Sequence, residues 1–156
     1  MTRNNKRARR ADKRRRGFTL IEIMVVVMII GMLTSLVGVA VMRQLERAKR
    51  KTAAAQIKNF SAAIESYYMD NSRYPSTDQG LKALVTAPSS SPAPKNYPQG
   101  GYLSSGEIPL DPWQNEYIYF SPGTNGGAYS IESYGADGLD GGDGDNADVE
   151  SWNPGQ

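Results

Sequence analysis

Residues 18–42, FTLIEIMVVVMIIGMLTSLVGVAVM, form a long apolar segment in which Glu22 is the only charged residue. At ~1.5 Å per residue, a helix of this length spans a hydrocarbon core of ~30 Å with some tilt. The segment is longer than the roughly 7–15 apolar residues of an ordinary secretory signal, and no small-residue cleavage site follows it. We therefore expect a transmembrane helix, and a removed signal peptide is the poorer interpretation.

Basic residues lie on both sides of this segment. Residues 1–16 hold nine Lys and Arg against one acid, Asp12, and residues 43–58 hold six more. The first group reads as a solvated leader peptide on the cytoplasmic side, which places the C-terminal part of the chain outside. The inverted orientation stays an alternative, because both flanks attract the cytoplasmic side.

The charge of the chain is divided unevenly. The formal net charge is +2, but residues 1–58 contain fifteen of the eighteen Lys and Arg against three acids, whereas residues 59–156 contain three against thirteen. A pI near 8.8 is shared by many nucleic-acid-binding proteins. Here, however, the basic residues flank an apolar segment and do not interleave with aromatics. We therefore expect no nucleic-acid binding.

The chain contains neither Cys nor His. This excludes disulfides, thiolate nucleophiles, imidazole bases and the usual zinc, copper and haem ligands supplied by this chain. Oxygen ligands remain. A small exported domain without disulfides needs another source of stability, such as a hard metal ion or packing against neighbouring subunits.

The helical pattern continues beyond the apolar segment. Apolar residues recur at spacings of four, three, four and three and form what we call the helix stripe: Ala53, Ile57, Phe60, Ile64 and Tyr67. This spacing is typical of one helix face. No Pro or capping sequence interrupts residues 18–70, so we expect a single helix of about 53 residues, roughly 80 Å long. Pro75 helps to end it, because the residue before Pro is pushed out of helical geometry.

The remainder predicts a small β-containing region. Ser76 and Gln79 have the spacing of a capping box, which predicts a short helix to about Val85. Residues 117–120, YIYF, and 128–133, AYSIES, are rich in aromatic and β-branched residues, and the PGTNGG between them predicts a hairpin.

Two strands alone are marginally stable. We expect the hairpin to pack on the helix stripe with a third short strand, either around Tyr102 and Leu103 or within residues 149–152.

We therefore predict an α+β fold in which a long N-terminal α-helix, half transmembrane and half amphipathic, packs on a small antiparallel β-sheet. Residues 1–17 form the leader, residues 18–42 the transmembrane half of the helix, and residues 43–156 the outer domain. The parts of that domain are a helix over 43–70, a loop over 71–115, a hairpin over 116–133 and an acidic loop over 134–152.

The acidic loop contains five carboxylates within twelve residues: Asp137, Asp140, Asp143, Asp145 and Asp148. Spaced by glycines, they repel one another and favour disorder unless a cation gathers them. Calcium suits the loop best, because it takes six to eight oxygens in flexible geometry, backbone carbonyls included, whereas magnesium demands a tighter octahedron. The EF-hand pattern does not fit. The alternative is a solvated acidic turn.

Glu22 needs a partner or a role of its own. A charge at the centre of a spanning helix costs ~2.5–3.5 kcal/mol on insertion scales, and less near its end. If the chain is cut after Gly17, the new amine of Phe18 supplies the partner, either on the same helix or from a neighbouring subunit. The alternative is an acid close enough to the membrane interface to stay hydrated.

Residues 16–26, RGFTLIEIMVV, resemble the class III signal of type IV pilins and of the pseudopilins of type II secretion. The resemblance is specific, because glycine, phenylalanine, glutamate and a long apolar run coincide after a basic leader. It implies that a prepilin peptidase cuts after Gly17 and methylates Phe18. It also implies that Glu22, with Phe18, aligns successive subunits during assembly.

Downstream motifs narrow the resemblance to the major pseudopilins of type II secretion, the G-type subunits. These motifs are DNSRYPSTDQGLKALV at 70–85, DPW at 111–113 with YIY at 117–119, and SYGADG at 133–138. The resemblance implies a structural subunit of the inner membrane, with its C-terminal domain in the periplasm, that polymerises through its helix into a pseudopilus driving export of folded proteins. The implied partners are other copies of the chain, minor pseudopilins, the prepilin peptidase and the inner-membrane secretion platform.

The resemblance also implies a set of calcium ligands. Asp137 matches the first carboxylate ligand of the pseudopilin calcium site, Asp148 the second, and Tyr134 the residue that gives a backbone carbonyl. The three other aspartates of the acidic loop lie in an insertion-prone stretch and are secondary candidates. The chain departs from the family at Val39, where proline is frequent, and at residues 114–116, where Gly-Asn-Pro is common.

Two other functions fit parts of the sequence. A type IV pilus subunit would share the cleavage signal and the helix. A membrane-anchored, metal-dependent hydrolase would use the clustered aspartates, because paired carboxylates can do acid–base work. A glycine-rich loop on so small a domain offers no evident cleft for catalysis. We therefore expect neither enzymatic activity nor a catalytic residue.

Overall fold

The computed structural model describes residues 17–153, except the side chains of Leu36 and Asp145. All of the predicted leader, residues 1–17, except Gly17 therefore lies outside the described residues. The chain divides between Val41 and Met42 into two compact units.

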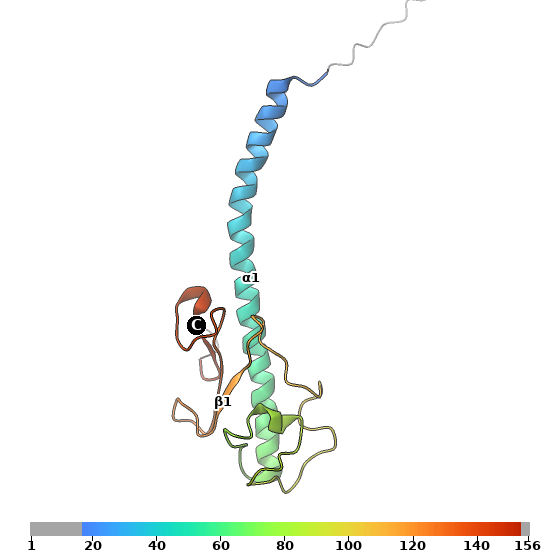
Figure 1. Ribbon diagram of the computed structural model, residues 1–156, viewed down its shortest axis with the longest axis vertical. Helices are drawn as coiled ribbons and strands as arrows, with labels where there is room; N and C mark the ends of the chain where they lie inside the picture. The colour runs from blue at the N-terminus through green and yellow to red at the C-terminus, as the bar shows by residue number, and fades with distance from the viewer. Residues whose placement is uncertain (1–16, 154–156) are drawn as a thin grey trace, which may run out of the picture. The chain divides into compact units, whose positions relative to one another are not determined.

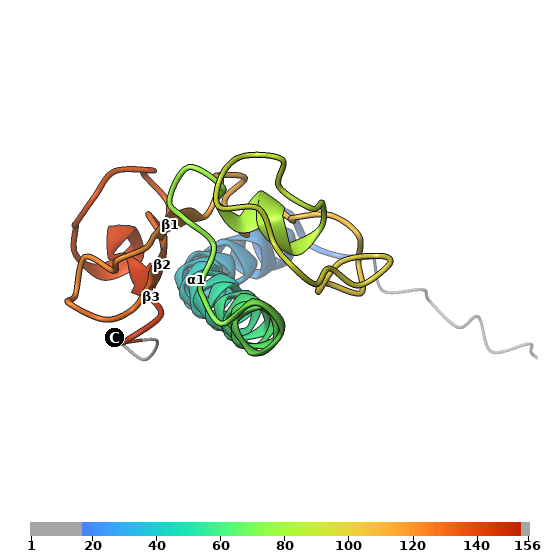
Figure 2. The same ribbon diagram turned by 90° about the horizontal axis from the view of Figure 1, so that it is seen from below.

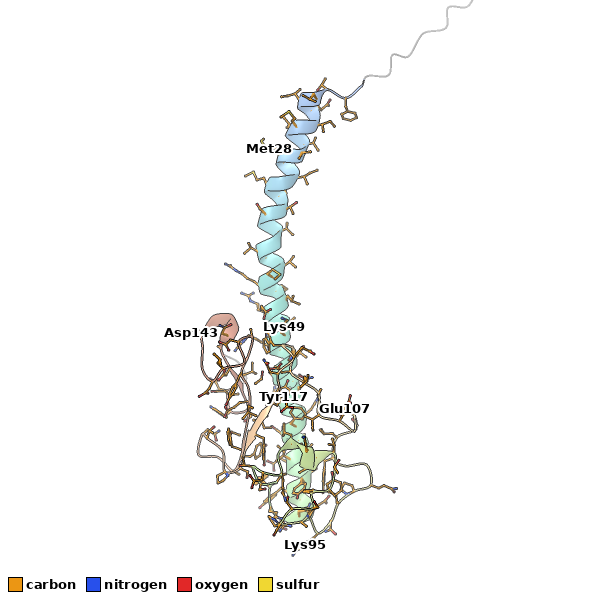
Figure 3. All side chains as sticks on the ribbon, in the orientation of Figure 1. Met28, Lys49, Lys95, Glu107, Tyr117 and Asp143 are labelled. Carbon is orange, nitrogen blue, oxygen red and sulfur yellow. The ribbon has the colours of Figure 1, made fainter. Side chains whose placement is uncertain are left out.

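The long helix α1 spans Leu20–Asn71 (Figure 1). It begins two residues after the predicted start at Phe18 and ends one residue after the predicted end at Asp70, so the prediction of a single uninterrupted helix is confirmed. In the first unit the described large apolar side chains of α1 are exposed, for example Leu20 at 82% and Met28, which Figure 3 labels, at 68%. A soluble core helix would bury such residues.

The core of the second unit is built on the helix stripe. All five of its members, Ala53 to Tyr67, are no more than 2% exposed. Other elements cover them with apolar side chains: Leu81, Leu84, Tyr117, Tyr119, Ile131 and Val149. The predicted helix stripe is therefore the side of α1 that faces the core.

The sheet has three antiparallel strands, in the order β1-β2-β3. These are β1 (Ile118–Phe120), β2 (Ser130–Ser133) and β3 (Val149–Glu150). Tyr119 pairs with Ile131 and Ser133 with Val149. The view in Figure 2 shows the three strands beside α1. The predicted hairpin is confirmed.

Of the two candidates for the third strand, only the C-terminal one forms a strand. Tyr102 lies in a loop, where its backbone N–H donates to the Leu84 carbonyl at 2.7 Å.

The short helix predicted between the capping box at Ser76 and about Val85 is present only in its second half, as a 3₁₀ helix, although the capping box itself forms. Gln79 N–H donates to Ser76 Oγ at 3.3 Å, and Ser76 N–H donates to Gln79 Oε1 at 3.1 Å. These bonds close a turn. Gly80 then takes a φ of +58°, which an α-helix cannot include, and only the short 3₁₀ helix η1 (Leu81–Leu84) follows.

Asp111 ties the segment before β1 to the sheet. Its side chain is buried, and Oδ1 accepts the backbone N–H groups of Trp113 at 2.9 Å and Asn115 at 2.8 Å. Oδ2 accepts the Ser133 hydroxyl at 2.6 Å. Gln114, inside this turn, has a φ of +76°, a conformation that favours the glycine common in the resembled family.

Candidate functional sites

The predicted cleavage bond between Gly17 and Phe18 lies just before α1. Residues 17–19 have no regular secondary structure, and Phe18 is 77% exposed. Exposed backbone outside a helix is accessible to a peptidase. The position is compatible with cleavage, which stays a prediction.

Glu22 has a local partner that the sequence analysis did not anticipate. Its backbone N–H donates to Thr19 Oγ1 at 3.3 Å, and the Thr19 N–H donates to Glu22 Oε2 at 3.4 Å. This is a capping box at the start of α1, and the signal for it was the spacing Thr-x-x-Glu. The uncut chain thus gives the Glu22 carboxylate a weak partner before any new amine exists.

At the opposite end of the chain, Asp148 is the residue best placed to bind a cation among the described side chains of the acidic loop. Oδ2 accepts the Gly141 N–H at 2.8 Å, whereas Oδ1 is buried and accepts no hydrogen bond within the described part of the chain. Burial raises the pKa of the Asp148 carboxyl, and the hydrogen bond from Gly141 lowers it by less. The negative charges of Asp140, Glu132 and Asp137 raise this pKa further. The site therefore favours a proton or a cation.

Two acids of the sheet extend this negative region. Glu132 on β2 pairs in register with Glu150 on β3. Burial first, then the Glu132 and Asp148 charges, raise the pKa of Glu150. Like charges directly opposite one another destabilise a sheet, so a cation bound near this pair would stabilise the sheet. This pair was not predicted, because the sequence does not show which residues of two strands face one another.

The remaining candidates are less organised. Asp137 is exposed, and its Oδ1 accepts the Leu139 N–H at 3.1 Å. Asp140 and Asp143 are exposed too, and Asp143 marks the loop in Figure 3. The Asp145 side chain lies outside the described residues. Within residues 17–153, no three acidic side chains converge closely enough to hold a metal ion by themselves.

Carbonyl oxygens of the same loop have a partner on α1. The Arg50 guanidinium donates to the carbonyls of Ala147, of Asp148 at 3.2 Å and of Gly144 at 3.5 Å. No sequence pattern indicated this contact, because it joins residues more than ninety positions apart.

Comparisons with known proteins cover both halves of the chain. The family model described as "Type II secretion system (T2SS), protein G" matches residues 40–152. The chain belongs to this protein G family. A second model, "Prokaryotic N-terminal methylation motif", matches residues 12–38, which include Gly17, Phe18 and Glu22.

Similar proteins agree with this membership. The type II secretion system core protein G of Pseudomonas aeruginosa is 49% identical over 136 residues, covering 87% of this chain and 94% of the relative. That of Vibrio cholerae serotype O1 is 45% identical over 141 residues, covering 90% and 94%. The predicted relationship to the G-type pseudopilins is confirmed.

A solved structure supports the fold. The crystal structure of the major pseudopilin from the type 2 secretion system of enterohaemorrhagic Escherichia coli matches with a TM-score of 0.62 and 34% identity. The match covers 71% of this chain and 92% of that one. The long helix with a small antiparallel sheet is thus the fold of a protein G family member.

Proposed function

We propose that the chain is a structural subunit of the periplasmic pseudopilus of type II secretion and polymerises through α1 to drive folded proteins across the outer membrane. The match of residues 40–152 to the protein G family carries this proposal. The role requires a stable, repeating subunit and no catalytic group.

We also propose a single-pass position in the inner membrane. Among the described residues, one helix is long and apolar enough to cross a membrane, and the window that meets this test has a mean hydropathy of 2.6 and is not buried within the protein. The basic leader lies in the cytoplasm and residues 43–156 in the periplasm. The partners are further copies of the chain, minor pseudopilins, the prepilin peptidase and the inner-membrane platform.

Processing can be tested at the N-terminus. We expect co-expression with a prepilin peptidase to yield a chain that starts at Phe18 and carries one added methyl group, by N-terminal sequencing and mass spectrometry. A Gly17→Ala variant is expected to stay uncut. A native product that starts elsewhere would contradict the proposal, and surface pili with intact secretion would favour a type IV pilus subunit.

We further propose that the acidic loop binds Ca²⁺ through the carboxylates of Asp137 and Asp148 and the backbone carbonyl of Tyr134. Support comes from the buried Oδ1 of Asp148, for which the described part of the chain offers no hydrogen-bond donor, and from the carboxylates around it. Because these acids are not all gathered, backbone carbonyls and water must complete the six to eight oxygens that calcium takes. The bound ion would offset part of the negative charge of the loop and tie it to the sheet.

Chelation tests the calcium site. We expect a chelator to lower the melting temperature of the full-length chain in detergent, and Asp137→Ala and Asp148→Ala to abolish the difference. Binding only to the folded state stabilises by ~2.7 kcal/mol at a hundredfold excess of calcium over its Kd. The exposed Asp78 provides the control variant Asp78→Ala, which should respond like the native chain. A native chain indifferent to chelation would refute the site.

A further inference from the structure

Arg50 meets the acidic loop where the loop enters the sheet. The three carbonyl oxygens that accept its hydrogen bonds belong to Gly144, Ala147 and Asp148, within a stretch of five residues. Gly144 opens the short 3₁₀ helix η2 (Gly144–Asn146), and Ala147 is its C-terminal cap. Arginine suits this contact, because its planar fork presents several N–H donors in a fixed geometry.

Three contacts together hold Asp148 in place, and the contact with Arg50 is one of them. Arg50 holds the Asp148 carbonyl from α1, and the Gly141 N–H holds Oδ2 from the loop. The next residue, Val149, is paired with Ser133 in the sheet. The backbone and one carboxylate oxygen of Asp148 are thus restrained, and the buried Oδ1 accepts no hydrogen bond from the residues that the structure describes.

We propose that Arg50 is a positioning residue for the cation site, because it anchors residues 144–148 to α1 and so presents the Asp148 carboxylate to the ion. The inference rests on the calcium site proposed above. It also links that site to the helix through which the subunit is proposed to polymerise. Residues that orient metal ligands from outside the coordination sphere typically change metal affinity by roughly 10–100-fold.

Charge and position predict opposite effects of removing Arg50. A guanidinium close to the site repels Ca²⁺, so a purely electrostatic role predicts that calcium binds more tightly when the charge is lost. A positioning role predicts weaker binding, because the loop then has to be ordered at the expense of binding free energy. The direction of the change therefore separates the two.

The experiment measures the calcium Kd of the full-length chain in detergent by isothermal titration calorimetry. We expect Arg50→Gln to raise the Kd about tenfold. Arg50→Lys keeps the charge without the fork and should restore only part of the affinity. The control is Arg47→Gln on the exposed part of the same helix, which should bind as tightly as the native chain or slightly better. An Arg50→Gln Kd equal to or below the native value overturns the proposal.

A second measurement separates this inference from the calcium site itself. In chelator, hydrogen exchange of the Gly141 and Val149 amides should be faster in Arg50→Gln than in the native chain, while amides of α1 near Phe60 stay unchanged. If the native chain binds no calcium, the calcium site fails and the exchange rates alone decide whether Arg50 anchors the loop. Equal exchange in both chains would show that it does not.

Discussion

Two donors hold the Glu46 carboxylate on α1. Lys49 Nζ donates to Oε1 at 2.9 Å, and Trp113 Nε1 donates to Oε2 at 2.9 Å. The bond from Lys49, followed by that from Trp113, lowers the pKa of Glu46 below its ordinary value. Because the folded state then binds fewer protons than the unfolded one, the stabilisation is complete above the unfolded pKa of about 4.3 and is lost as the pH falls through the folded pKa.

We therefore expect Glu46→Gln to lower the free energy of unfolding by about 0.5–1 kcal/mol at pH 7 and by less at pH 3. Urea unfolding of the full-length chain in detergent, followed by near-UV circular dichroism, measures both values. Glu107→Gln, at an exposed acid, is the control and should change neither. A cost for Glu46→Gln that is the same at both pH values would contradict this account.

At the scale of elements, Asp111 connects the turn before β1 to β2 through its three hydrogen bonds. We expect Asp111→Ala to destabilise the protein by about 3 kcal/mol or more, because the buried Ser133 hydroxyl and two part-buried backbone N–H groups lose their acceptor. Asp111→Asn keeps the shape and one acceptor oxygen, so its cost should be smaller. Urea unfolding checks the order of the two variants. If Asp111→Ala lowers the free energy of unfolding no more than the exposed-site control Asp78→Ala does, the role given to the Asp111 side chain is wrong.

Sequence alone predicted the elements that local patterns determine. The spacing of apolar residues from Ala53 to Tyr67 is that of one helix face, so both α1 and its buried side could be predicted. The third strand could be narrowed only to two candidate segments. The pairing of Val149 with Ser133 joins residues far apart in the sequence, and no local pattern predicts it. The helix after Ser76 is shorter than predicted and of the 3₁₀ type, because a capping box does not reveal the φ of +58° at Gly80.

The candidate sites show the same limit. The number of aspartates in the acidic loop was enough to predict that it binds a cation. Only the family resemblance singled out Asp137 and Asp148 as ligands. The partners that shape the loop could not be seen. Glu150 faces Glu132 because of sheet register, and Arg50 reaches the loop from a distant part of the chain.

At the scale of the whole molecule, the separation of charge agrees with the proposed position in the membrane. Most basic residues lie in residues 1–58, and thirteen of the sixteen acids lie in residues 59–156. An acidic outer region is not drawn to the cytoplasmic side by the positive-inside rule, whereas the basic leader is. The exceptions are the six Lys and Arg of residues 43–58, which the proposed topology places in the periplasm, and Glu22, an acid that must enter the apolar environment with the helix.

The capping box and the proposed amine give Glu22 two possible roles, and two substitutions separate them. Thr19→Ala removes the threonine hydroxyl from the box and keeps the carboxylate, whereas Glu22→Ala removes both the box and any partner for the Phe18 amine. We expect both variants to be cut after Gly17. Only Glu22→Ala should fail to form filaments, because an unpaired charge at the new terminus is costly in an apolar assembly.

Filaments sheared from cells that overexpress the secretion genes, quantified by immunoblotting against total subunit, measure the difference. Glu22→Asp tests whether the carboxylate must also reach the right distance. If Thr19→Ala loses filaments as completely as Glu22→Ala, the carboxylate acts through the helix start, and the pairing with a subunit's new amine is wrong.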